Sequence, residues 1–158
     1  KTHNIVFVGA FKTLYTLQKL LRIFHLEYNL SPNKFQIQSE PPDSVKNFSP
    51  TDIKGGSYEK DFAVVAKGAG PEGSTILLLL GFADTGVLEA SRAVTDQQMV
   101  NTITYDLAHE ATVKPFHFTL VVETEGLNQA IFKSRVLYFS HNKTSVVKTN
   151  STTSSKTN

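Results

Sequence analysis

Two stretches of the sequence, IVFVGAFKT (residues 5–13) and LLLLGFADT (residues 77–85), share one pattern: an apolar run, then Gly, then Thr four residues later. An uninterrupted apolar run is typical of a strand that is buried on both faces, as in a parallel sheet covered by helices. Each stretch therefore predicts a central strand, a tight glycine turn and a helix N-terminus. We expect the strands at 5–8 and 76–80 to be parallel neighbours.

The two glycine turns predict a single ligand-binding crevice. In open α/β sheets, ligands bind outside the carboxyl ends of the strands, where helix N-termini offer free N–H groups. Two such ends that lie next to each other make one crevice. The residues expected to line it are Gly9, Ala10, Phe11, Lys12, Thr13, Gly81, Phe82 and Thr85. The alternative for each glycine is a structural turn without a ligand.

Hydrophobic periodicity predicts the remaining elements. Apolar residues at spacings of three and four favour helices, and alternating residues bounded by turn residues favour strands. Helices are expected from residue 12 to 24, from 86 to 93 and from 95 onward, and further strands at 26–30, 34–38, 61–67, 116–124 and 131–140. Residues 39–60 are polar and rich in Pro and Gly, which predicts a long surface loop. Its part from Asp52 to Tyr58 is expected to cover the crevice.

These elements predict the α/β class: a single three-layer, Rossmann-like or flavodoxin-like domain with a mixed sheet and a C-terminal antiparallel hairpin. The domain is expected to span residues 1–141. Residues 142–158 are too poor in apolar side chains to offset their ordering entropy, so a disordered tail is expected. Asp84 or Thr85 is expected to cap the helix at 86–93, and Thr95 the helix that follows.

Composition narrows the function classes. The chain has 158 residues, 11 of them Phe, which suffices for one core. Its net charge is +2 with scattered basic residues, whereas nucleic-acid binding needs them clustered. The chain has no Cys, which excludes disulfides, thiolate catalysis and thiolate zinc sites. No apolar stretch is long enough to span a bilayer.

No catalytic, nucleotide or metal motif is present in the sequence. The phosphate-loop and GxGxxG fingerprints are missing, and so is the GxSxG elbow of α/β-hydrolases. The five His residues lack metal-ligand spacing. Glu123 and Glu125 share a strand face, where solvated charge is the ordinary outcome. We therefore predict no cofactor, no metal and no catalysis.

Several short motifs together suggest a family. They are Gly9-Ala10-Phe11 followed by Tyr15-Thr16, Asp61-Phe62-Ala63, the glycines Gly81 and Gly86, and Thr95-Asp96. Over residues 4–140 this pattern resembles an uncharacterised C-terminal α/β domain of bacterial regulators, which carry an N-terminal winged helix or other helix-turn-helix and often a membrane span. The sequence departs from that pattern at Lys12 and Thr13. The resemblance implies a sensory role and an extracytoplasmic, periplasmic setting.

Three functions remain open on the sequence. The first is a non-catalytic sensory domain of a larger regulator that binds a small molecule or a partner protein. The second is a structural dimerisation module without a ligand, in which an exposed strand edge pairs two copies. The third is an enzyme of the nucleotide- or flavin-handling kind that uses the strand-end crevice.

Overall fold

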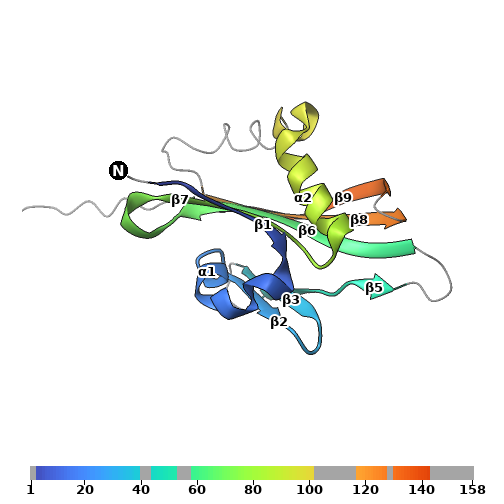
Figure 1. The fold of residues 1–158 in the computed structure, drawn as a ribbon, viewed down its shortest axis with the longest axis horizontal. Helices are drawn as coiled ribbons and strands as arrows, with labels where there is room; N and C mark the ends of the chain where they lie inside the picture. Colours follow the sequence, from blue (N-terminus) through green and yellow to red (C-terminus); the bar gives the residue numbers. More distant parts are fainter. Residues whose placement is uncertain (1–2, 40–43, 53–57, 102–116, 128–129, 143–158) are drawn as a thin grey trace, which may run out of the picture.

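The chain folds into two β-sheets, which the computed structural model describes for residues 3–39, 44–52, 58–101, 117–127 and 130–142 (Figure 1). Helices labelled η are of the 3₁₀ type. In chain order the elements are β1 (Ile5–Ala10), η1 (Phe11–Leu17), α1 (Gln18–Arg22), β2 (Leu26–Asn29), β3 (Lys34–Ser39), β4 (Ser44–Phe48), β5 (Thr51–Asp52), β6 (Tyr58–Ala69), η2 (Pro71–Gly73), β7 (Thr75–Gly81), α2 (Asp84–Thr95), β8 (His117–Leu127) and β9 (Ala130–Asn142).

The larger sheet has the strand order β1-β7-β6-β8-β9, and β5 pairs with the start of β6. Only β1 and β7 are parallel among its described pairs; β6 pairs antiparallel with both β7 and β8, and β8 with β9. The smaller sheet, β2-β3-β4, is antiparallel throughout. Figure 1 shows α2 on one face of the larger sheet and the smaller sheet with α1 on the other.

The predicted three-layer, Rossmann-like or flavodoxin-like α/β fold is wrong, because the protein is a mostly-β domain of two sheets. A Rossmann-like sheet consists of parallel strands joined by crossover helices. Here most neighbouring strands are antiparallel, and a short connection joins β6 to β7. An apolar run signals burial on both faces but not strand direction, since a central antiparallel strand between two layers has the same composition.

Several elements are confirmed. Strands form at both apolar runs, β8 and β9 make the predicted C-terminal hairpin, and α2 forms at the helix predicted for residues 86–93. The segment predicted as a loop at 39–60 contains β4 and β5, and β6 starts within it. The predicted tail at 142–158 lies outside the described residues except for Asn142, which ends β9. Within the described ranges, no helix is long and apolar enough to cross a membrane.

Two apolar layers cover the two faces of the larger sheet. On the α2 side, Ala90 and Ala93 of the helix pack against Val65, Leu79 and Val122. On the opposite side the two sheets meet through six aromatic rings. These are Phe11, Tyr28, Phe35, Phe48, Phe62 and Phe82, in contact as stacked, tilted or T-shaped pairs. This aromatic cluster anchors the smaller sheet, because burying large aromatic side chains is strongly favourable.

The prediction that β1 is a central strand is wrong, although it is the parallel neighbour of β7 as expected. Among the described strands, β1 forms one edge of the larger sheet. Val6 is 60% exposed and Val8 is 52% exposed, whereas Leu78 on β7 is fully buried. The apolar run of β1 therefore does not reflect burial on both faces.

This difference predicts unequal effects of two substitutions. Leu78→Ala is expected to lower the free energy of unfolding by about 2 to 4 kcal/mol, because it leaves a cavity in the core. Val6→Ala is expected to cost less than about 1 kcal/mol, because the side chain is mostly in water already. Urea or guanidinium denaturation of both variants measures the difference. Equal losses would contradict the assignment of β1 to the edge.

Candidate functional site

The ends of the two predicted strands do meet. Gly9 pairs with Leu80, and Ala10 pairs with Gly81. The residues that follow diverge: Phe11 is buried in the aromatic cluster with its ring centre 5.1 Å from that of Phe82. Aromatic rings thus pack between the strand ends and the smaller sheet.

Some of the other residues predicted to line the crevice are exposed to solvent, and others are buried in the core. Lys12 and Thr13 are exposed. Thr85 is buried, and its methyl group lies so close to Gly126 of β8 that a side chain there would overlap it. The ligand-binding role of the eight residues stays a prediction.

The N-terminus of α2 is capped from a distant strand. Asp61 on β6 is only 1% exposed, and its carboxylate accepts four backbone hydrogen bonds. Its Oδ1 accepts from the N–H groups of Phe62 (2.7 Å) and Phe82 (3.1 Å), and its Oδ2 from those of Ala83 (2.9 Å) and Gly86 (2.7 Å). We refer to this arrangement as the Asp61 cap.

The Asp61 cap corrects the prediction that Asp84 or Thr85 is the N-cap. The N-cap position is Ala83, whose methyl side chain cannot accept a hydrogen bond, and Asp61 supplies the acceptor in its place. Burial raises the pKa of Asp61, while the four N–H donors act in the opposite direction. The donors that a bound anion would use at this helix start are already bonded to a carboxylate.

Two glycines make this close approach possible. A side-chain carbon on Gly86 would lie 2.6 Å from Asp61 Oδ2 and 2.8 Å from the carbonyl oxygen of Phe62. A side-chain carbon on Gly81 would overlap the backbone of the first turn of α2. In the equivalent position of the first stretch, a side-chain carbon on Gly9 would meet only the ring of Phe7, at 3.3 Å. The repeated glycine therefore has a packing role in one stretch and not in the other.

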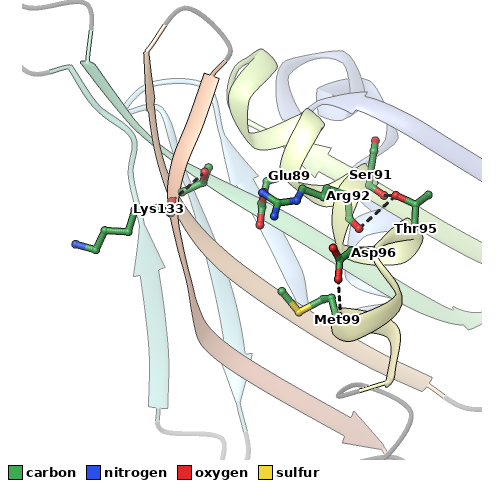
Figure 2. Close-up of polar contacts among 8 residues, drawn as sticks. Glu89, Ser91, Arg92, Thr95, Asp96, Met99 and Lys133 are labelled. Atoms are coloured by element: carbon green, nitrogen blue, oxygen red, sulfur yellow. Dashed lines mark hydrogen bonds and ion pairs between the residues drawn. The ribbon is translucent and has the colours of Figure 1, made fainter.

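The strongest candidate site lies further along α2, at Glu89. This side chain is 2% exposed and faces the apolar layer between α2 and the sheet. Its Oε2 atom is buried without a hydrogen-bond partner. The nearest cation is Arg92 one turn later, with its Nη1 atom 3.8 Å from Oε2, and the Arg92 side chain is 56% exposed. Figure 2 shows the two side chains adjacent to each other below α2.

Glu89 lines a cavity of about 300 Å³ between the end of α2 and β9. Arg92, Asp96, Gln98 and Ser134 supply its other polar side chains, and Ala93 and Met99 its apolar ones. A second cavity of about 410 Å³ shares Arg92 and is otherwise lined by Leu88, Ser91, Thr95 and Ile131. We refer to the first one as the Glu89 cavity.

Neighbouring polar groups already have backbone partners. Asp96 Oδ1 accepts from the N–H groups of Gln98 (2.9 Å) and Met99 (3.0 Å), so Asp96 caps the helical residues 97–101 (Figure 2). The prediction that Thr95 is this cap is wrong, because its hydroxyl donates to the carbonyls of Ser91 and Arg92. Among the buried side-chain atoms described, Glu89 Oε2 alone has no hydrogen-bond partner.

A second group of charges lies on the other face of the larger sheet. Glu123 and Glu125 share that face as predicted. Glu123 pairs with Lys60 at 2.7 Å and Arg135 at 2.9 Å, and Glu125 pairs with Lys133 at 3.5 Å. Each of these carboxylates therefore has a cation on a neighbouring strand, and the ion pairs support the pairing of β8 with β6 and with β9.

Comparisons of the chain with family models, with curated proteins and with solved structures find no match. In the described part of the chain, no three His, Asp or Glu residues lie close enough together to hold a metal ion. Neither observation bears on the resemblance to regulator domains, which stays a prediction. The sequence did not predict the Glu89 cavity, because Glu89 is a single charged residue within a predicted helix. The one signal in the sequence was the spacing of three residues between Glu89 and Arg92, which places the two side chains next to each other on a helix.

Proposed function

We propose that this chain is a non-catalytic sensory domain that binds a small molecule with a cationic or N–H donor group in the Glu89 cavity. The observation that carries the proposal is the buried Oε2 atom of Glu89, which has no hydrogen-bond donor and lines a cavity. The regulator context and the extracytoplasmic setting enter the proposal through the resemblance alone.

A buried carboxylate without a donor is costly, because it loses its water and gains nothing in return. Arg92 offsets this cost only in part: its guanidinium lies 3.8 Å away and is mostly exposed, where solvent weakens the pair. A ligand N–H group seated on Oε2 supplies the missing hydrogen bond. Hydrogen bonds to charged groups contribute about 1.5 to 3 kcal/mol, more than a neutral pair does.

The charges that line the Glu89 cavity and its volume favour a small cation as the ligand. The cavity is lined by two carboxylates, Glu89 and Asp96, and by one guanidinium, that of Arg92. This excess of negative charge attracts a primary amine or a similar group. A volume of about 300 Å³ is at the lower end of small-molecule sites, so amines and amino acids fit better than nucleotides or flavins.

The test is a thermal-shift screen with primary amines, diamines and amino acids against the wild type and Glu89→Gln. At about 100 times its dissociation constant, a ligand stabilises the folded state by about 2.7 kcal/mol, which raises the melting temperature by several degrees. We expect such a shift in the wild type and its loss in Glu89→Gln. Without ligand, Glu89→Gln is expected to be at least as stable as the wild type, because it removes a buried charge that the mostly exposed Arg92 offsets only in part.

Glu125→Gln is the matched control, since Glu125 carries the same side chain on the other face of the sheet. It should keep the ligand-dependent shift. Equal stabilisation of Glu89→Gln by every hit contradicts the proposed site. A hit that survives Glu89→Gln but is lost in Lys12→Ala with Thr13→Ala would move the site to the strand-end crevice. A screen without any hit contradicts the ligand class.

A further inference from the structure

The edge strand β1 has the properties of an unprotected pairing surface. Its six residues contain no charge and no Pro, and its pairing with β7 runs without a register shift. Its other side has no strand partner among the described residues. Val6 and Val8 expose aliphatic side chains on the α2 side of the sheet, and Ile5 does so on the opposite side. An uncharged, regular edge of this kind is a template for another strand.

The other edge of the same sheet is protected in the usual ways. β9 pairs with β8 through two register shifts, near Leu137 and Phe132. It also carries Lys133 and Arg135, which are exposed. Bulges and charges hinder pairing of an edge with a further strand. The contrast between the two edges indicates that the open edge of β1 has a function.

We infer that β1 pairs antiparallel with β1 of a second copy of this chain, so that two larger sheets join across a two-fold axis at Phe7. In such a pair, the side chains of two opposed residues lie on the same face of the joined sheet. Side chains alternate between the two faces along β1, so the two opposed residue numbers are both odd or both even, and their sum is even. The midpoint of Ile5–Ala10 corresponds to a sum of 15, so the even sums 14 and 16 are equally well centred. We choose 14, because it places the exposed Val6 and Val8 of the two copies opposite each other. In this register Val6 lies opposite the partner's Val8.

The side chains fit this register. Each exposed valine meets a valine of the other copy, and such pairs of β-branched residues stabilise neighbouring strands. Ile5 lies opposite the partner's Gly9, where only the ring of Phe7 would contact an added side-chain carbon within 4 Å. Because Ile5–Ala10 has no charged residue, no like charges are brought face to face within the strand pair.

The contact area is small. A stable interface typically buries about 1,600 Å² in total, more than a six-residue strand pair with a few exposed side chains provides. We therefore expect a reversible dimer with a dissociation constant on the order of micromolar. Sedimentation equilibrium over roughly 5 to 500 µM covers this range.

The main test exchanges charges at Val6 and Val8. The double variants Val6→Lys with Val8→Lys, and Val6→Glu with Val8→Glu, should each be monomeric at the highest concentration tested, because like charges then lie opposite each other. An equimolar mixture of the two should form a heterodimer, since opposite charges then meet across the axis. Both positions are exposed, so circular dichroism should show an intact fold. The control Val136→Lys, at an exposed site on β9, should keep the dimer.

The register is tested by cross-linking, which the Cys-free sequence makes clean. Directly opposed positions have Cβ atoms close enough for a disulfide. Under mild oxidation, Val6→Cys mixed with Val8→Cys should give more covalent heterodimer than either variant gives homodimer. A wild type that is monomeric throughout, a dimer that survives both charged variants, or loss of the dimer in Val136→Lys would each overturn the inference.

Discussion

Asp61→Ala is expected to lower the free energy of unfolding by about 3 to 5 kcal/mol, the largest effect predicted for a polar residue of this chain. The substitution removes the acceptor of four backbone N–H groups and leaves buried donors unpaired. Ordinary helix caps contribute about 1 kcal/mol, because water replaces the lost acceptor at an exposed helix end. At Asp61, which is buried beneath α2, the neighbouring backbone leaves little access for water.

Two further variants separate capping from the loss of volume. Asp61→Asn keeps the shape of the side chain but turns an NH₂ group toward two N–H donors, so a loss of about 2 to 4 kcal/mol is expected. Asp96→Ala is the matched cap control, because Asp96 caps residues in its own helical segment near the surface. Its loss should stay near 1 kcal/mol. If Asp61→Asn proves neutral in denaturant melts, the four hydrogen bonds do not hold α2 in place.

Gly81→Ala is expected to cost about 3 kcal/mol or more, because added atoms in a close-packed site force the backbone to move. The new methyl group would lie 2.5 and 2.7 Å from backbone carbons of Gly86 and closer still to the Val87 nitrogen. These atoms belong to the first turn of α2, so relief requires the helix to shift on the sheet. A shift would also disturb the Asp61 cap, which bonds to the Gly86 N–H.

Gly9→Ala is the control in the first apolar stretch. The added methyl group there approaches only the side chain of Phe7, at 3.3 Å, and a ring can yield by a small rotation. The expected change is within about 1 kcal/mol of the wild type. Comparing the thermal and denaturant midpoints of the two variants measures the difference. Equal losses would show that both glycines are required for packing, contrary to the structure.

The Asp61 and Gly81 substitutions bear on the proposed function, because both disturb α2, the helix that carries Glu89. α2 begins at the Asp61 cap and carries Glu89 and Arg92 toward its other end. The cap and the Gly81 contact fix the start of the helix against β6 and β7, and this in turn sets where Glu89 sits above the sheet.

The repeated motif on which the strand-end crevice was predicted, an apolar run followed by Gly and then Thr, has a different physical origin in each copy. Around Gly81 it reflects close packing of a strand end against α2, and around Gly9 it reflects only a strand that leads into η1. Both copies then direct a Phe, Phe11 or Phe82, into the aromatic cluster. The two similar stretches therefore form parallel strands that each lead into a helix. Close packing requires a glycine only at Gly81 and not at Gly9.

The sequence by itself determined the features that depend on neighbouring residues. Apolar runs located β1 and β7, the helix start expected after the Gly81 turn located α2, and alternation with a turn located the β8–β9 hairpin. The parallel pairing of β1 with β7 also followed from it. Such patterns are local, since periodicity records which side of an element faces apolar surroundings.

Only the tertiary structure decided strand order, the open edge at β1 and the partners of buried charges. The composition of β1 matches that of a central strand, yet no described strand covers its outer side. Asp61 caps a helix that begins 23 residues later, and the buried Oε2 atom of Glu89 has no hydrogen-bond donor among the described residues. These properties arise from contacts between segments far apart in the chain, and the pattern within one segment carries no information about its long-range partners.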